Sequence, residues 1–301
     1  MNLSYLKLAL SKKIPQLAIH SALKSKNFTE YGWALTKAPQ PVTDKLKERL
    51  HEGLRIRDKE TGPLDTKDKT TFFVADYEQN DEILMELLPL HEAWSGVKLR
   101  PHVSYGLRVY RGDVTLKMHI DDPETHIISS ILHVDHGEND KPWPIVIEDF
   151  KGNTNEVILE SGDMLFYESS KCMHGRPGYY HGDYYSSIFT HYTPLEDWDG
   201  EREFERVPEH YDRVVSLPKG DTTEYITSDG TSVVEPSCDY GWCNLKDSVK
   251  WYGPAPGYGK ILTGNGEVTE LGGIPSERSF KKTRPMNVKK RQILLSGADD
   301  F

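Results

Sequence analysis

The sequence has little cysteine, with three in 301 residues. So few cysteines exclude a disulfide-stapled fold and are typical of a reducing compartment. Long hydrophobic runs are also lacking, which excludes a transmembrane helix. Basic residues number 37 against 47 acidic ones, so the formal net charge is −10. Nucleic acids and anionic membranes require a basic face, and we therefore expect neither as a partner.

Residues 1–26 contain lysines but no arginine, and their leucines and isoleucines recur at roughly helical spacing. This pattern favours an amphipathic helix over an organellar transit segment, although it leaves the second interpretation open. We expect a soluble, cytoplasmic protein. Its 12 histidines, several of them between His102 and His191, are the feature that needs an explanation.

The chain divides into three stretches that we expect to form one integrated domain. Residues 1–97 indicate a helical support region, with one helix starting at Thr43 and ending near Gly62, and another over Asn80 to Ser95. Residues 98–194 contain short alternating or apolar runs separated by turns, which are typical of strands. The predicted fold is α+β, with a double-stranded β-helix (jelly-roll or cupin-like) core. Residues 195–301, rich in glycine, proline and charge, indicate an irregular C-terminal extension.

Two histidines and one aspartate have the arrangement of an open iron site. Such sites use two imidazoles and one carboxylate on one face of Fe(II). His119 and Asp121 form a His-X-Asp motif after a predicted strand, and His174 follows several strands later. His133 and Asp135 form a competing His-X-Asp motif. We prefer His119, Asp121 and His174 as ligands and place His133 on a strand as an inward-pointing polar group.

The motifs in this region, taken in order, resemble a known family. They are Tyr105-Gly106-Leu107-Arg108-Val109-Tyr110, His119-Ile120-Asp121, Ser161-Gly162-Asp163-Met164-Leu165-Phe166 and His174-Gly175-Arg176-Pro177. This order is similar to the prolyl 4-hydroxylase-like branch of the Fe(II)/2-oxoglutarate-dependent oxygenases. The resemblance implies a double-stranded β-helix, Fe(II) held by the three ligands above, 2-oxoglutarate as cosubstrate and O2 as oxidant, with ascorbate as an optional reductant.

The sequence departs from that family at the position of the cosubstrate cation. Relatives place a lysine or arginine after the second histidine, where this chain has Asp183 and Tyr184. A buried carboxylate still requires charged or hydrogen-bonding partners. The residues expected to bind 2-oxoglutarate are Tyr110, His133, Arg176 and Ser187. The residues expected to bind substrate are Arg108, Lys117 and His126.

The resemblance implies oxidation of an unactivated C–H bond with release of succinate and CO2. Segments such as Ile145 to Phe150 and Asp163 to Glu168 also faintly resemble the red-algal oxygenases that form kainoid amino acids. We therefore expect a small amino-acid-like substrate that is hydroxylated or oxidatively cyclised. Alternatives are a prolyl or aspartyl hydroxylase acting on a protein, a 2-oxoglutarate-independent cupin-type metal enzyme, and a non-catalytic cupin-like binding module.

Three further patterns have weaker interpretations. Cys238 and Cys243 indicate zinc or a redox disulfide only weakly, because a structural zinc site needs four ligands. The glycine-rich stretch Gly253 to Gly266 is consistent with a mobile lid. The basic run from Arg278 to Arg291 is expected to be a solvated tail, and Trp143 is expected to anchor core packing.

Overall fold

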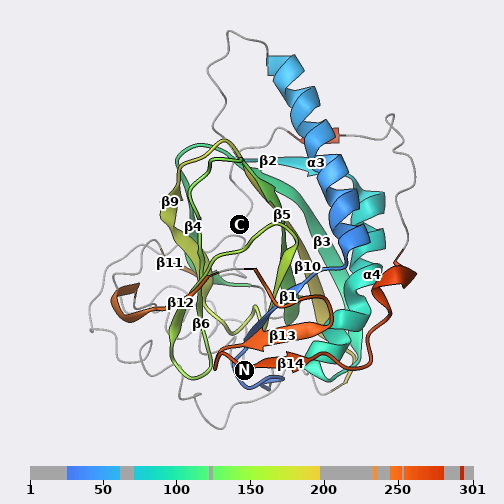
Figure 1. The fold of residues 1–301 in the computed structure, drawn as a ribbon, viewed down its shortest axis with the longest axis vertical. Coiled ribbons are helices and arrows are strands. Elements are labelled where there is room, and N and C mark those ends of the chain that lie inside the picture. The colour runs from blue at the N-terminus through green and yellow to red at the C-terminus, as the bar shows by residue number, and fades with distance from the viewer. Residues whose placement is uncertain are drawn as a thin grey trace, which may run out of the picture.

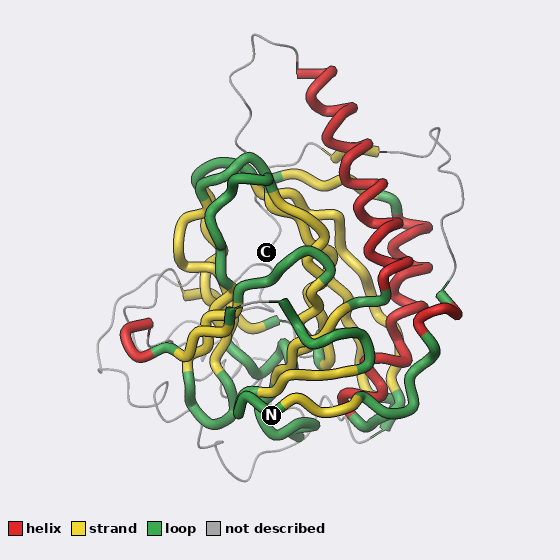
Figure 2. The backbone as a smooth tube through the Cα atoms, in the orientation of Figure 1, coloured by secondary structure: helices red, strands yellow, loops and turns green. Residues whose placement is uncertain are grey.

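Two β-sheets face each other across the interior of the protein, and helices cover the outer face of the larger sheet (Figures 1 and 2). The structure is a computed structural model that describes residues 26–61, 71–121, 125–196, 233–235, 245–252, 254–280 and 292–294. The larger sheet has the strand order β14-β13-β1-β8-β5-β10-β3-β2-β15, and the smaller has β11-β4-β9-β6-β7-β12.

Eight consecutive strands are divided equally between the two sheets, and the chain crosses from one sheet to the other at every connection but one. The larger sheet receives β3 (Leu99–Tyr110), β5 (Ile128–His136), β8 (Asp163–Tyr167) and β10 (Tyr185–Pro194). The smaller sheet receives β4 (Val114–Ile120), β6 (Ile145–Glu148), β7 (Thr154–Val157) and β9 (His174–Tyr180). Neighbouring strands within each set are antiparallel. This is the connectivity of a double-stranded β-helix, and the predicted fold of the core is confirmed.

The pattern of burial on β5 explains why the central strands are almost continuously apolar. Leu132 and Val134 pack in a cluster with residues of both helices, on the outer face of the larger sheet. Ile131 points the other way and packs with Ile145 and Ile147 of the smaller sheet. Because both faces of β5 are covered, apolar residues stabilise both, and strict alternation with polar residues is lost.

The two predicted helices are present, with earlier starts than the sequence indicated. Helix α3 spans Gln40–Thr61 and α4 spans Tyr77–Ser95. The Asp76 side chain caps α4 by accepting a hydrogen bond from the Gln79 N–H at 3.1 Å, and the chain leaves the helix at Gly96 with φ of 73°. This region is not wholly helical, because β1 (Trp33–Lys37) and β2 (Phe72–Ala75) also lie in it and join the larger sheet.

The described parts of the C-terminal extension add short strands to both sheets. Strands β13 (Lys260–Thr263) and β14 (Val268–Glu270) continue the larger sheet beyond β1, and β15 (Gln292–Leu294) pairs with β2. In the smaller sheet, β11 (Val233–Glu235) pairs with β4, and β12 (Val249–Trp251) with β7. Short 3-10 turns occupy Leu245–Asp247 and Glu277–Ser279. The glycine-rich stretch that is predicted to be a mobile lid therefore contains β13, which pairs with β1 in the larger sheet.

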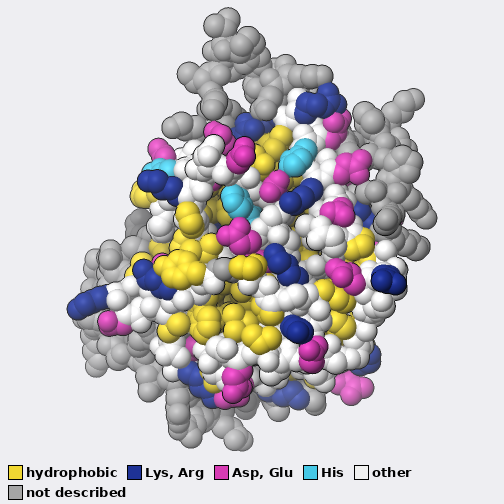
Figure 3. All heavy atoms as spheres, in the orientation of Figure 1, with side chains coloured by type: hydrophobic (Ala, Val, Ile, Leu, Met, Phe, Trp, Pro, Cys, Tyr) yellow, Lys and Arg dark blue, Asp and Glu magenta, His cyan; other side chains and the backbone are white. Residues whose placement is uncertain are grey.

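Several predictions fall outside the residues that the structure describes. These are the helix before residue 26, the Cys238 and Cys243 pair and the basic run over residues 281–291. The domain boundaries at 97 and 194 stay predictions. Within the described part of the chain, no helix is both long and apolar enough to cross a membrane. On the face seen in Figure 3, basic and acidic side chains are interspersed rather than segregated.

Candidate metal centre

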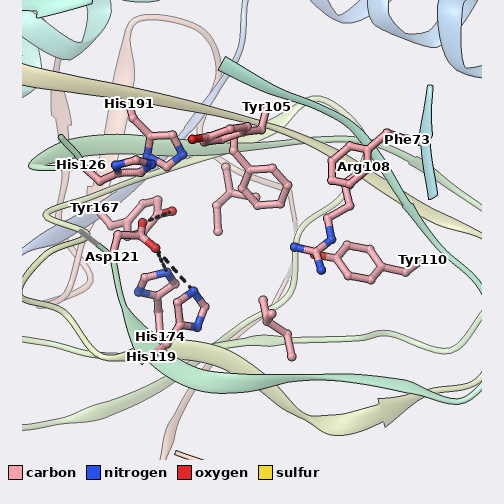
Figure 4. A pocket seen from close by; sticks show the side chains of 13 residues that line it. Phe73, Tyr105, Arg108, Tyr110, His119, Asp121, His126, Tyr167, His174 and His191 are labelled. Atoms are coloured by element: carbon pink, nitrogen blue, oxygen red, sulfur yellow. Dashed lines mark hydrogen bonds and ion pairs between the residues drawn. The ribbon is translucent and has the colours of Figure 1, made fainter. Parts of the chain in front are cut away.

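His119, Asp121 and His174 meet at one end of the barrel interior (Figure 4). His119 is near the end of β4, and its backbone is paired with that of His174 at the start of β9. Asp121 follows β4 directly, and its backbone N–H donates to the Ser169 carbonyl at 3.0 Å. The strand register therefore brings the two imidazoles together, and the loop between β8 and β9 holds the carboxylate beside them.

The donor atoms of the three side chains are close enough to share one metal ion. The Asp121 Oδ1 lies 3.5 Å from the His119 Nε2 and 3.7 Å from the His174 Nε2. The ligand atoms all lie within 4.8 Å of one another, and no other such group occurs among the described residues. Two imidazoles and one carboxylate are the donor set of open, non-haem Fe(II) sites.

Neighbouring groups orient two of the three side chains. The Cys172 carbonyl lies 2.8 Å from the His174 Nδ1. Because a carbonyl can only accept, the His174 Nδ1 carries the proton and its Nε2 lone pair is presented to the site. The Tyr167 hydroxyl donates to the Asp121 Oδ2 at 3.4 Å, which leaves Oδ1 facing the imidazoles.

The protonation states suit metal binding. Burial lowers the pKa of His174 to about 4, and the adjacent His119 acts in the same direction, so this imidazole is neutral at physiological pH. Burial alone raises the pKa of Asp121, but the facing imidazoles of His174 and His119 outweigh it and hold that pKa well below the usual range. Burial raises the pKa of Tyr167 well above 10, so its hydroxyl stays a donor.

The three side chains line a pocket of about 550 Å³, open solvent included. Tyr105, His126 and His191 line the same end as His119 and His174, with the His126 and His191 rings 3.9 Å apart. Figure 4 shows Arg108, Tyr110 and Phe73 at the opposite end. Tyr167 also lines the pocket, and the other lining residues, Leu116, Ile131 and Phe189, are apolar.

The residues expected to bind 2-oxoglutarate are only partly brought together. Tyr110 lines the pocket, but His133, Arg176 and Ser187 are not among the residues lining it. His133 stacks on Tyr185 with ring centroids 4.0 Å apart, and its Nε2 shares a hydrogen bond with the His136 Nδ1. The Ser187 hydroxyl is buried and has no hydrogen-bond partner among the described residues.

Arg176 lies in an aromatic cluster beside the pocket. Its NH1 donates to the Trp143 carbonyl and its NH2 to the Tyr185 hydroxyl at 3.0 Å. Its guanidinium is 4.6 Å from the ring centroids of both residues. Trp143 also packs against Tyr110 and Tyr180, which confirms that this tryptophan anchors core packing.

Among the residues expected to bind substrate, Arg108 and His126 line the pocket. The side chain of Lys117 lies outside the described part of the structure. Seven lining residues were not predicted as site residues: Phe73, Tyr105, Leu116, Ile131, Tyr167, Phe189 and His191. Strand alternation offers a signal for His191, because it shares a face with Phe189, but the sequence does not show which face is internal.

The competing motif does not form a second centre. The Asp135 carboxylate lies 2.8 Å from the His51 Nε2 of α3, on the outer face of the sheet. His133 contacts Tyr185 and His136 instead. The two side chains therefore contact different residues, and among the described residues they do not form a group that could hold a metal ion. This geometry favours His119 and Asp121 as the metal ligands.

Comparisons with known proteins gave structural similarities only. A scan of protein-family models found no match, and neither did a search of curated proteins. The solved structures to which the chain is similar include HygX from Streptomyces hygroscopicus with nickel and 2-oxoglutarate bound, at 14% identity and a TM-score of 0.40, over 56% of this chain and 86% of that one.

Two further solved structures are similar at the same level. One is a Pseudomonas putida prolyl-4-hydroxylase, at 16% identity and a TM-score of 0.37, over 58% of this chain and 94% of that one. The other is an oxidoreductase of the 2OG-Fe(II) oxygenase family from Burkholderia pseudomallei, at 12% identity and a TM-score of 0.35, over 56% and 95% of the two chains. All three TM-scores are below 0.5.

Proposed function

We propose that this protein is an Fe(II)/2-oxoglutarate-dependent dioxygenase that oxidises an unactivated C–H bond of a small, amino-acid-like metabolite. The observation that carries the proposal is the grouping of His119, Asp121 and His174 inside a double-stranded β-helix, with all their ligand atoms within 4.8 Å of one another. Three ligands on one face would leave positions open for cosubstrate and oxygen.

The residues present fit Fe(II). His174 is neutral and has its Nε2 directed to the site, and Asp121 is ionised. A set of two imidazoles and one carboxylate, without thiolate, suits Fe(II) better than structural zinc, because structural zinc sites are usually closed by four ligands. When bound, Fe(II), 2-oxoglutarate and O2 would supply the oxidising power, with succinate and CO2 as products and ascorbate as an optional reductant.

The chain itself would contribute orientation and a dry pocket. The Cys172 carbonyl orients the His174 ring and the Ser169 carbonyl holds the Asp121 backbone, so backbone groups contribute to the metal-binding geometry. Ile131 and Phe189 line the pocket with apolar groups, which would help to exclude water once a ligand is bound. The half-buried side chains of Tyr105 and Arg108 offer polar groups to whatever ligand enters.

The finer assignments follow from these placements. Tyr110 is proposed to contact 2-oxoglutarate, and His126 is proposed to contact substrate. Arg176, His133 and Ser187 do not line the pocket, and we propose that they support the 2-oxoglutarate site from outside it. Either hydroxylation or oxidative cyclisation is compatible with this arrangement, because both begin with removal of one substrate hydrogen. We propose these two outcomes together, as alternative fates of one substrate radical.

An anaerobic titration tests the proposal. Protein loaded with Fe(II) and titrated with 2-oxoglutarate should develop the weak visible charge-transfer band of the metal chelate. Absence of the band while Fe(II) stays bound would contradict the oxygenase and favour a cupin-type metal enzyme, and absence of metal binding would favour a non-catalytic module. The band should also be lost in the His119→Ala variant.

Mass spectrometry of candidate substrates then separates the remaining alternatives. Gain of one oxygen atom indicates hydroxylation, and loss of two hydrogen atoms indicates cyclisation or desaturation. Free amino-acid derivatives and proline- or aspartate-containing peptides should be assayed in parallel. Turnover confined to the peptides would replace the metabolite substrate with a protein one.

A further inference from the structure

Arg108 is the one guanidinium among the described residues that lines the pocket. It lies on β3, two residues before Tyr110 and on the same face of the strand, so both side chains point inward. Figure 4 shows its guanidinium at the end of the pocket opposite His119, Asp121 and His174. A ligand bound at the metal group would therefore extend toward Arg108.

The guanidinium is held in position but has no anionic partner in the described part of the chain. Its Nε is buried and makes no hydrogen bond there. Its central carbon lies 4.9 Å from the centroid of the Tyr110 ring and 5.9 Å from that of Phe73. Aromatic faces attract the cation and limit its rotation, but they do not satisfy its N–H donors.

The lining residues offer no carboxylate that could neutralise this charge. The one acidic side chain among them is Asp121, which lies with the two metal-site histidines at the other end. A half-buried cation with free donors and no internal acid is stabilised when a ligand brings the anion. The planar fork of the guanidinium matches a carboxylate, which it can bind through two parallel hydrogen bonds.

Arg176, a buried arginine beside the pocket, already has hydrogen-bond partners. Its two terminal nitrogens donate to Trp143 and Tyr185 within the aromatic cluster, and its side chain does not line the pocket. The contacts of Arg176 are those of a residue that supports packing. The contacts of Arg108 leave its terminal nitrogens for a ligand.

We propose that Arg108, rather than Arg176, binds a ligand carboxylate at the end of the pocket opposite the metal group. The carboxylate belongs either to the distal end of 2-oxoglutarate or to an acidic, amino-acid-like substrate. This inference rests on the proposed function, since both ligands are those of the oxygenase. It moves carboxylate recognition from β9, which carries Arg176, to β3.

Binding measurements on wild type and the Arg108→Gln and Arg176→Gln variants test this assignment. Each Fe(II)-loaded protein is titrated anaerobically with 2-oxoglutarate and with 2-oxobutyrate, which lacks the distal carboxylate, and calorimetry follows L-glutamate in the presence of saturating 2-oxoglutarate. We expect R108Q to weaken binding of one carboxylate ligand by about 30-fold or more, with Fe(II) affinity unchanged. Weaker binding of 2-oxoglutarate but not of 2-oxobutyrate assigns the cosubstrate, and weaker binding of L-glutamate alone assigns the substrate.

The results that would contradict the assignment to Arg108 are also distinct from one another. If R108Q leaves both affinities within twofold of wild type, or if wild type binds neither 2-oxoglutarate nor L-glutamate, the assignment is wrong. Loss of affinity in R176Q but not in R108Q returns the role to Arg176. Melting curves of the loaded proteins identify a folding defect, in which case Arg108→Lys, which keeps the charge but loses the fork, should bind with intermediate affinity. A wild type that binds L-glutamate but gives no band with 2-oxoglutarate would contradict the proposed function without contradicting Arg108.

Discussion

The Lys171 Nζ lies 2.9 Å from the Glu168 Oε2, and neither side chain is exposed to solvent. Glu168 also accepts hydrogen bonds from the backbone N–H groups of Phe28 and Thr29, and Lys171 donates to the Asn27 side chain at 2.9 Å. The pair thus fastens residues 26–29 to the loop between β8 and β9. That loop carries the two carbonyls, of Ser169 and Cys172, that hold Asp121 and His174.

Breaking this pair should affect both stability and metal binding. Glu168→Gln or Lys171→Met leaves one charge buried without its partner, which costs about 3–5 kcal/mol of unfolding free energy. We also expect Fe(II) affinity to fall about 10-fold, because the loop positions two ligands. Urea unfolding and metal titration measure the two effects.

The double variant and an exposed pair provide the controls. Glu168→Gln with Lys171→Met should be less destabilised than the sum of the single variants, since no charge is left unpaired. Lys98→Met, which removes a 2.6 Å ion pair between Glu92 and a lysine that is 77% exposed, should cost less than about 1 kcal/mol. Equal costs at the two pairs would mean that burial of the first pair is unimportant.

Removal of a proposed ligand should distinguish the two His-X-Asp motifs. His119→Ala is expected to reduce Fe(II) affinity about 100-fold or more, because it removes one of three protein ligands. His133→Ala removes a buried ring that stacks on Tyr185, so it should lower the melting temperature with little effect on metal affinity. Metal binding that survives in His119→Ala but disappears in His133→Ala would reverse the assignment.

The hydroxyl of Tyr167 is expected to strengthen metal binding by Asp121. Tyr167→Phe removes its 3.4 Å hydrogen bond to the Asp121 Oδ2, and we expect Fe(II) affinity to fall roughly 5- to 10-fold. Tyr184→Phe is a matched control, because the Tyr184 hydroxyl donates to the Asp135 Oδ2 at the same distance, away from the site. A similar loss of affinity in both variants would show that the effect is not specific to Asp121.

Acid should destabilise the protein through its buried histidines. Burial lowers the pKa of His91 to about 3, against about 6.5 when unfolded, so the unfolded chain binds more protons between these values. The stability contributed by neutral His91 is therefore complete above pH 6.5 and is lost as the pH falls, by about 2 kcal/mol between pH 7 and pH 5.

Urea unfolding at these two pH values checks the contribution of His91. His91→Gln should lose about 2 kcal/mol less than wild type over the interval. An unchanged pH dependence in His91→Gln would assign the acid sensitivity to other buried groups.

The contact between α3 and β2 should be intolerant of added volume. A Cβ at Gly53 would lie 2.4 Å from the Val74 Cγ1, which is inside van der Waals contact. We expect Gly53→Ala to destabilise the fold by roughly 1–3 kcal/mol despite the better helix propensity of alanine. At the exposed Gly178 an added Cβ meets no atom within 4 Å, so Gly178→Ala should leave the melting temperature nearly unchanged.

The sequence predicted features that depend on local pattern. The spacing of leucines predicted both helices, and short alternating or apolar runs predicted β3, β5, β6, β8 and β10, whereas β9, which carries His174, was not predicted as a strand. The His-X-Asp motif and His174 were singled out by residue type and order, and the strand register does bring them together. Strands β1 and β2 were missed because they are stabilised by partners far away in the sequence.

Side-chain direction within the barrel could not be predicted in the same way. His133 is a buried polar residue on a core strand, as expected, and Arg176 is buried on β9, which was not predicted as a strand. Their contacts are with Tyr185 and Trp143. These contacts depend on how three strands pack together, which the local pattern of one strand does not encode. Arg108, in contrast to these two residues, does line the pocket. Its position there depends on which face of β3 turns inward.

Strand β1 lies between β8 and β13, so residues from both ends of the chain lie side by side, with Ala34 opposite Thr263. Without β1, the backbone N–H and C=O groups along that edge of β8 would be unpaired. An open edge of this kind recruits other chains and promotes aggregation. A fragment limited to residues 98–194 would therefore keep all three proposed metal ligands and yet be a poor candidate for soluble expression, whereas a fragment that retains residues 26–280 would keep this edge covered.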